Sequence, residues 1–305
     1  MKNLVIILML AFCCNCLADN NQPAHVIITA GQSNTDGRVP NDRLPDYIKA
    51  MSTDTAFTTG AYKYCKIAQN RTDGKFRPFW PKSKRRAKPH TWGYDAITYY
   101  WLEQLWQEPF YVIKWAIGGT SIEPSNASDK SIHWSANPEW LSGNVATSQK
   151  GRSLLLSFIN DIDGCIDNTL SKLKNGYRID AFLWHQGESD RHKGKNYYKN
   201  LKAVIAYVRN FLVEKTGNKQ YKKLPFICGT VAHSNKQYSA DVETALYKLA
   251  KEDKNFYVID MSKAELQKDR LHFTAESAEY LGIKMYNKLV DLGIAGKKAK
   301  EIGIK

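Results

Sequence analysis

The segment 25–37, which reads HVIITAGQSNTDG, decides the fold of this chain. Its first six residues form a short apolar run that is rich in β-branched side chains, which is typical of a buried strand. Gly31 follows directly and lets the backbone turn sharply. Ser33 then stands where a helix can begin. The segment therefore predicts a strand that presents a serine hydroxyl, with backbone N–H groups near it, at the rim of a sheet.

Further short apolar runs and helical patterns alternate along the rest of the chain. The runs do not alternate cleanly between apolar and polar residues, which favours parallel strands covered on both faces. Strands that alternate with helices predict βαβ units and a doubly wound α/β sheet. The further predicted strands are 110–117, 181–185, 224–231 and 256–260, and the predicted helices are 94–106, 153–173, 197–214, 240–250 and a last one from Thr274 to about Gly293.

The first eighteen residues have the features of a secretory signal peptide. Lys2 gives a positive start, an apolar stretch covers 4–12, and 16–18 (CLA) resembles a small-residue cleavage site. This predicts a secreted or periplasmic protein with one domain over residues 19–305. Lipid attachment to a cysteine in 13–16 is the alternative. The apolar stretch is too short to span a membrane, so no membrane span is predicted.

The chain is strongly basic, with a formal net charge of +14. The densest basic run is 82–88 (KSKRRAK). Such a run either attracts an acidic partner, for example a uronate or sialate glycan, or forms a solvated loop. No zinc-finger spacing or RNA-binding motif accompanies the charge, so nucleic acid is not expected as a partner. The loop-rich segment 38–92 is expected to wall a cleft or to cover one sheet edge.

Residues suited to nucleophilic catalysis follow the predicted strands. A serine hydroxyl needs a histidine to take its proton and a carboxylate to hold that histidine. Asp269 and His272 lie three residues apart before the last helix, so the carboxylate can reach one ring nitrogen and leave the other for Ser33. The plainer interpretation is a helix-capping serine and an unrelated Asp and His at a helix start.

Two further segments could stabilise an oxyanion. The amide of Gln186 lies at the end of the third predicted strand, and Gly119 belongs to a flexible turn after the second. Both segments could equally be simple polar turns. No Gly-x-Ser-x-Gly elbow, phosphate-binding loop or His-Glu-x-x-His metal motif is present in the sequence. His133 and His185 are scattered, so no metal site is predicted. Four tryptophans could stack on sugar rings or lie in the core, namely Trp80, Trp92, Trp134 and Trp140.

Four segments in this order, 31–38 (GQSNTDGR), 117–122 (IGGTSI), 184–190 (WHQGESD) and 269–272 (DRLH), resemble the SGNH-hydrolase superfamily. The resemblance is to the group of sialate O-acetylesterases and acetylxylan esterases, carbohydrate esterase family 6. It extends from about residue 25 to the last helix. It implies a flavodoxin-like three-layer α/β/α sandwich around a five-stranded parallel sheet. It also implies removal of acetyl groups from sugar hydroxyls without a cofactor.

The resemblance assigns roles to individual residues. It implies Ser33 as the nucleophile, His272 as the base and Asp269 as the residue that orients it. It implies an oxyanion hole made by the N–H groups of Ser33 and Gly119 and by the side-chain amide of Gln186. The supporting residues that we expect around the nucleophile are Gln32, Asn34 and Glu188.

The segment around the nucleophile also departs from the family pattern. Thr35 and Asp36 stand where the family more often has Met and a small residue, while Arg38 is closer to the acetylxylan-type branch. The sugar therefore stays open between acetylxylan and sialate types. Two alternatives are a non-catalytic protein that binds acetylated glycan, and an esterase of the same superfamily with broader acyl specificity. The oligomeric state is not predicted.

Overall fold

The computed structural model describes residues 22–54, 60–70, 72, 74–82, 89–124, 132–142 and 153–304. The predicted signal peptide and residues 83–88 of the basic run lie outside these ranges. Among the described residues, no helix is both long enough and apolar enough to cross a membrane.

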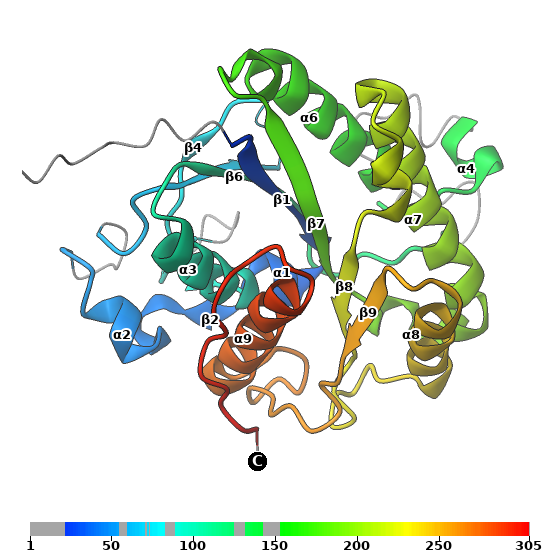
Figure 1. Cartoon of the computed structure of the whole chain (residues 1–305). Coiled ribbons are helices and arrows are strands. Elements are labelled where there is room, and N and C mark those ends of the chain that lie inside the picture. Colours follow the sequence, from blue (N-terminus) through cyan, green and yellow to red (C-terminus); the bar gives the residue numbers. More distant parts are fainter. Residues whose placement is uncertain are drawn as a thin grey trace, which may run out of the picture.

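The described part of the chain is built on a seven-stranded sheet (Figure 1). Strand β1 (Ala24–Gly31) lies in the middle, with β6 (Phe110–Ala116) parallel on one side and β7 (Tyr177–His185) parallel on the other. Strands β8 (Phe226–Gly229) and β9 (Phe256–Ile259) continue the sheet beyond β7. The five predicted strands are all present, in the order second, first, third, fourth, fifth. The predicted α/β class and flavodoxin-like arrangement are therefore confirmed.

Two strands extend the sheet beyond the five predicted ones. Strand β3 (Cys65–Gln69) pairs in parallel with β6, and the short β4 (Arg77–Pro78) pairs with β3 in antiparallel fashion. Both come from the loop-rich segment 38–92. This segment was expected to wall a cleft or to cover a sheet edge, and it instead adds two strands to that edge.

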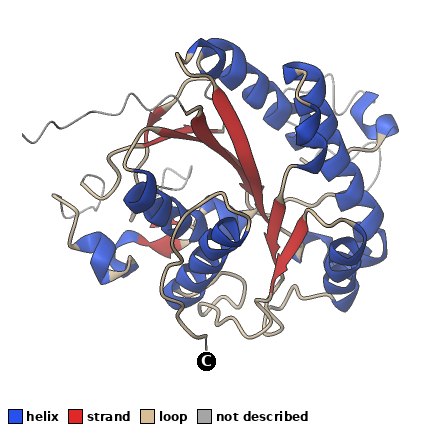
Figure 2. Cartoon of the chain, viewed as in Figure 1, coloured by secondary structure: helices blue, strands red, loops and turns tan. Residues whose placement is uncertain are grey.

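Helices cover both faces of the sheet (Figures 1 and 2). Helices α3 (Tyr94–Trp106) and α9 (Ala275–Asp291) pack on one face, in a core that includes Ile27 of β1. The core on the other face includes Val26 and Ile28 of β1. Because successive strand residues point to opposite faces, a sheet covered on both sides buries every position. The helices over this second face are α6 (Leu154–Asn168), α7 (Gly194–Thr216) and α8 (Ala240–Glu252).

The helix boundaries follow local capping chemistry. Helix α9 begins after Thr274, whose side chain accepts a hydrogen bond from the backbone N–H of Ser277, as its sequence predicts. Helix α6 ends at Asn168, five residues before the predicted end, and a short 3₁₀ turn follows. The remaining elements are α1 (Ser33–Asp36), α2 (Asp46–Lys49), α4 (Pro138–Ser142), β2 (Val39–Pro40), β5 (Thr91–Trp92) and the 3₁₀ turns η1 (Asn41–Arg43), η2 (Leu170–Lys172), η3 (Glu188–Lys193) and η4 (Lys219–Lys223).

Gly31 sits where β1 approaches its neighbour most closely. Its φ is +150°, and a Cβ atom there would lie 2.2 Å from the carbonyl oxygen of His185 in β7. The same carbonyl accepts a hydrogen bond of 3.1 Å from the backbone N–H of Gln32. Only glycine fits this contact. It fixes where β1 ends, and so where α1 presents Ser33.

We expect Gly31→Ala to lower the free energy of unfolding by about 3 kcal/mol, since backbone strain and overpacking add at this site. Gly217→Ala is the matched control, because Gly217 has a φ of +70° but a Cβ atom added there would meet no described atom within 4 Å. The control is expected to lose only about 1 kcal/mol. Urea unfolding of both variants measures the difference. Equal losses would show that the contact with His185 is unimportant.

Candidate active site

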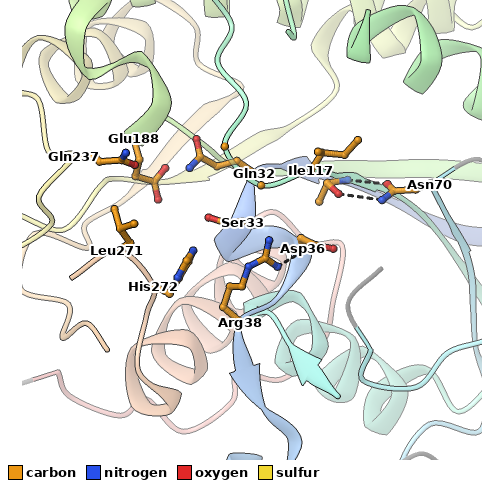
Figure 3. Close-up of a pocket in the computed structure, with 13 residues that line it drawn as sticks. Gln32, Ser33, Asp36, Arg38, Asn70, Ile117, Glu188, Gln237, Leu271 and His272 are labelled. Atoms are coloured by element: carbon orange, nitrogen blue, oxygen red, sulfur yellow. Dashed lines mark hydrogen bonds and ion pairs between the residues drawn. The ribbon is translucent and has the colours of Figure 1, made fainter. Parts of the chain in front are cut away.

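A cavity of about 720 Å³ opens beyond the carboxyl ends of the central strands (Figure 3). In doubly wound sheets this is where ligands bind, because the strand order reverses there. Segments far apart in the sequence meet in it: the start of α1, the turn after β6, the turn after β7 and the loop before α9. The residues that line the cavity are Gln32, Ser33, Asp36, Arg38, Asn70, Ala116, Ile117, Gly118, Gly119, Glu188, Gln237, Leu271 and His272.

Ser33 is the first residue of α1 and is 8% exposed. The turn after β6 packs directly against it, since a Cβ atom on Gly118 would lie 3.2 Å from the Cβ of Ser33. Gly119 in the same turn has a φ of +74°, a conformation that favours glycine. Among the described residues, the backbone N–H groups of Ser33 and Gly119 have no hydrogen-bond acceptor. Two donors are thus available at the cavity wall.

His272 and Asp269 form the hydrogen-bonded pair that their spacing predicts. The Nδ1 of His272 lies 2.6 Å from Oδ2 of Asp269, and Oδ1 of Asp269 accepts hydrogen bonds from the backbone N–H groups of Leu271 and His272 at 2.9 and 3.1 Å. Partial burial alone would raise the pKa of Asp269. The backbone N–H groups of His272 and Leu271, together with the His272 ring, outweigh it and hold this pKa below its ordinary value. Asp269 is therefore an anion held in place by hydrogen bonds, and it is the hydrogen-bond partner of Nδ1 of His272.

Ser33 and His272 line the same cavity, and Figure 3 shows the imidazole beside the serine hydroxyl. No hydrogen bond joins the two side chains within the described ranges. Contacts between a nucleophile and its base are often long without substrate and shorten when substrate binds. The arrangement brings the alcohol, the imidazole and the carboxylate to one rim of the sheet.

Asn34 ties three of the converging segments together. Its Nδ2 donates to Oε1 of Glu188 at 2.9 Å and to the carbonyl of Leu271 at 3.3 Å, while its Oδ1 accepts from the backbone N–H of Phe273 at 3.1 Å. These bonds connect α1 with the turn after β7 and with the loop that carries His272. The expected supporting residues Asn34 and Glu188 are thus in contact. Gln32, the third, accepts from the backbone N–H of Ser189 at 3.4 Å.

Glu188 is a buried anion within this framework. Its Oε1 also lies 3.2 Å from Nε2 of His185. Burial alone would raise the pKa of Glu188, but the neighbouring His185 and the hydrogen bonds from His185 and Asn34 outweigh it and lower this pKa. The carboxylate therefore stays charged at neutral pH.

The structure does not bring Gln186 to the cavity. This side chain is fully buried, and its Nε2 donates to Oδ2 of Asp190 at 2.6 Å and to the carbonyl of Thr120 at 3.1 Å. Its Oε1 accepts from the hydroxyl of Tyr197 at 2.9 Å. These two acceptors use both amide hydrogens, and through them the side chain supports the turn after β6 from behind. Gln186 has no hydrogen left for an oxyanion in this arrangement.

Asp190 holds the far end of the same turn. Its Oδ2 accepts from the backbone N–H of Ile122 at 2.9 Å and its Oδ1 from that of Glu123 at 3.0 Å. Burial raises the pKa of Asp190, and the N–H groups of Glu123 and Ile122 partly offset that rise. The segment 184–190 thus acts mainly as a clamp on the turn that carries Gly119.

Three residues of the cavity wall were not singled out from the sequence, namely Asn70, Ala116 and Gln237. Asn70 follows β3, in which polar residues interrupt the apolar run. The tryptophans considered as sugar platforms do not line this cavity, and Trp92, Trp134 and Trp140 are buried. His133 contacts Ser121 at 2.7 Å. Across the parts of the chain that the structure describes, no group of three His, Cys, Asp or Glu residues could hold a metal ion.

The comparison with known families identifies the class of this protein as a carboxylic ester hydrolase. The family model for carbohydrate esterases described as sialic acid-specific acetylesterases matches residues 23–291. The chain belongs to this family. A search of the curated proteins found no significant match.

Solved structures share the fold. A protein from Arabidopsis thaliana superposes with a TM-score of 0.58 at 20% identity, over 88% of this chain and 98% of that chain. NanS has a TM-score of 0.58 at 12% identity, over 89% and 98%. XAC1771, described as a novel carbohydrate acetylesterase from Xanthomonas citri, has a TM-score of 0.54 at 15% identity. That alignment covers 87% of this chain and 55% of the other.

We expect Glu188→Gln to lower the free energy of unfolding at pH 7 by about 1–3 kcal/mol, because a charged acceptor is lost. Since the folded-state pKa of Glu188 is lowered, the unfolded chain binds more protons between that pKa and about 4.3. The contribution is therefore present above this window and is lost as the pH falls through it. Urea unfolding at pH 7 and below pH 4 measures this.

The matched control is Glu214→Gln, at an exposed position on α7, which is expected to change stability by less than about 0.5 kcal/mol. A Glu188→Gln deficit that stays constant down to the acid limit would contradict the lowered pKa.

Proposed function

We propose that this protein removes O-acetyl groups from carbohydrates through a Ser33–His272–Asp269 triad and an acetyl-enzyme. The observation that carries the proposal is the meeting of Ser33 and His272 in one cavity, beside two backbone N–H donors, with the His272 ring held from behind by Asp269. Each of the three side chains has the chemistry that its role requires. Membership of a carbohydrate esterase family supports an acetylated sugar as the substrate.

The reaction follows from the positions of these groups. The Oγ of Ser33 attacks the acetyl carbonyl carbon, and Nε2 of His272 takes the hydroxyl proton. The N–H groups of Ser33 and Gly119 stabilise the oxyanion. The tetrahedral intermediate collapses, the sugar oxygen leaves with the proton from His272, and the acetyl group stays on Ser33. Water, deprotonated by His272, then attacks the acetyl carbonyl carbon. The bond to Oγ of Ser33 breaks, Oγ recovers its proton from His272, and acetate is released.

Asp269 supports both steps by holding the ring. Its bond to Nδ1 selects the tautomer that leaves Nε2 able to accept a proton, and its charge stabilises the imidazolium that forms. Its low pKa keeps it ionised throughout the neutral range. The carboxylate side chain is 43% exposed, so solvent screens part of this charge.

The cavity wall carries charged side chains that suit a polar leaving group. Asp36 and Arg38 form an ion pair of 2.6 Å beside the nucleophile, and both side chains are largely buried. Figure 3 shows the guanidinium of Arg38 between the Asp36 carboxylate and Ser33. Hydrogen-bonding groups of this kind suit a hydroxylated substrate. Acetylated xylan and acetylated sialosides are the two substrate classes to compare.

Ser33→Ala is expected to fold normally and to lose acetate release by a factor on the order of 10⁴ to 10⁶, because the nucleophile is absent. Acetate release from p-nitrophenyl acetate, acetylated xylan and acetylated sialosides is the measurement, with thermal unfolding as the check on folding. Ser171→Ala, at an exposed position in η2, is the control and should keep full activity. Full activity of Ser33→Ala would remove the serine from the mechanism. Binding of acetylated glycan with no turnover by the unaltered protein would favour a glycan-binding role.

Asp269→Asn is expected to lower kcat by a factor on the order of 10² to 10⁴ with KM nearly unchanged, since the ring loses its orienting anion but the substrate contacts stay. Asp241→Asn, at an exposed position in the first turn of α8, is the control. Steady-state kinetics on p-nitrophenyl acetate separate the two constants. A kcat for Asp269→Asn within threefold of the unaltered enzyme would show that another group orients His272.

A further inference from the structure

The turn after β6 carries Gly119 and is held at several points. On the side of β1, the backbone N–H of Ile117 donates to the carbonyl of Gly31 at 3.3 Å. Behind the turn, Gln186 and Asp190 hold its later residues. These contacts leave the start of the turn, at the end of β6, to be fixed from the side of β3.

Asn70 supplies that contact. Its Nδ2 donates to the carbonyl of Ala116 at 3.0 Å, and its Oδ1 accepts from the backbone N–H of the same residue at 2.9 Å. Its backbone N–H donates to the carbonyl of Lys114 at 2.9 Å. Figure 3 shows the side chain of Asn70 at the cavity wall near Ile117, with its hydrogen bonds as dashed lines. One residue therefore makes three hydrogen bonds to the strand end that precedes Gly119.

The backbone of Asn70 adopts a conformation that few residues tolerate. Its φ is +40°, in the left-handed region where asparagine is enriched among residues other than glycine. Asn70 is also 4% exposed. Unfavourable backbone geometry that persists in a buried residue beside an active site points to a function. Here the bend turns the amide of the side chain toward Ala116.

We propose that Asn70 is a positioning residue for the oxyanion hole, acting through Ala116 on the N–H of Gly119. The inference rests on the proposed function, because it assigns a purpose to that N–H group. A donor must lie 2.7–3.1 Å from the oxyanion to stabilise it. Gly119 has no side chain to hold its backbone in place, and it lies only three residues after Ala116. A shift of the strand end therefore also moves the backbone N–H of Gly119. Asn70 itself does not take part in the chemistry.

The chain contains a matched control for this contact. Asn287 of α9 is also buried, and it makes the same pair of bonds to one alanine: its Nδ2 donates to the carbonyl of Ala299 at 3.1 Å, and its Oδ1 accepts from the N–H of Ala299 at 2.8 Å. Asn287 does not line the cavity. Removing it costs this pair of bonds, together with a bond of 3.4 Å from Nδ2 to Oε1 of Glu301, and leaves the turn after β6 untouched.

The experiment compares Asn70→Gly, Asn70→Ala and Asn287→Ala in the full chain. Glycine at position 70 accepts the left-handed backbone and removes only the side chain, whereas alanine also adds strain. We expect kcat on p-nitrophenyl acetate to fall about 10- to 100-fold in both Asn70 variants, with KM within about twofold. Asn70→Ala should unfold at a lower temperature than Asn70→Gly. Asn287→Ala should keep kcat within about twofold while losing thermal stability.

A second readout reports on the oxyanion hole directly. Phosphylation of Ser33 by diethyl p-nitrophenyl phosphate places a phosphoryl oxygen in the hole, so its rate should fall in parallel with kcat in Asn70→Gly. A kcat for folded Asn70→Gly within twofold of the unaltered enzyme would overturn the inference, and so would an equal loss in Asn287→Ala. If Ser33→Ala releases acetate as fast as the unaltered enzyme, the proposed function is wrong, and the inference is wrong with it. If Ser33→Ala loses activity but Asn70→Gly keeps its kcat, only the inference about Asn70 is wrong.

Discussion

The close approach of β1 to β7 at Gly31 is the constraint on which the rest of the site depends. In the register of the sheet, Gly31 lies between Ala116 of β6 and His185 of β7. With no side chain at that point, the carbonyl of His185 can bond to the N–H of Gln32 and start α1 at Ser33. Ser33, the turn after β6 and the turn after β7 therefore come together around this backbone contact.

Buried polar side chains fix what that contact leaves free. Asn34 joins α1 to Glu188 and to the loop of His272, and Asp190 and Gln186 hold the turn after β6 from behind. Each of these side chains bonds to the backbone of a loop rather than to another side chain alone. Loops have few regular hydrogen bonds of their own, so such contacts decide where their N–H groups point. The site is thus rigid although it is built from turns.

The parts of the site that could be predicted are those with local causes. The five central strands followed from their apolar runs, and the Asp269–His272 pair followed from a spacing of three residues in one loop. Gln186 shows the limit. Its amide type and strand-end position suit an oxyanion donor, but Asp190, four residues later, takes one of its hydrogens and the carbonyl of Thr120 takes the other. Asn70 carried no local signal, because Lys66 and Gln69 interrupt the apolar residues of β3.

The sequence by itself determined the α/β class, the order of the elements and which residues could act as nucleophile, base and orienting carboxylate. Periodicity, chain turns and side-chain chemistry act over a few residues, so they can be read along the chain. Only the tertiary structure decided which donors face the cavity and which residues hold the turn after β6. These features depend on hydrogen bonds between residues far apart in sequence, such as Asn70 with Ala116. A donor hydrogen that is already bonded, as in Gln186, cannot also bond to a ligand.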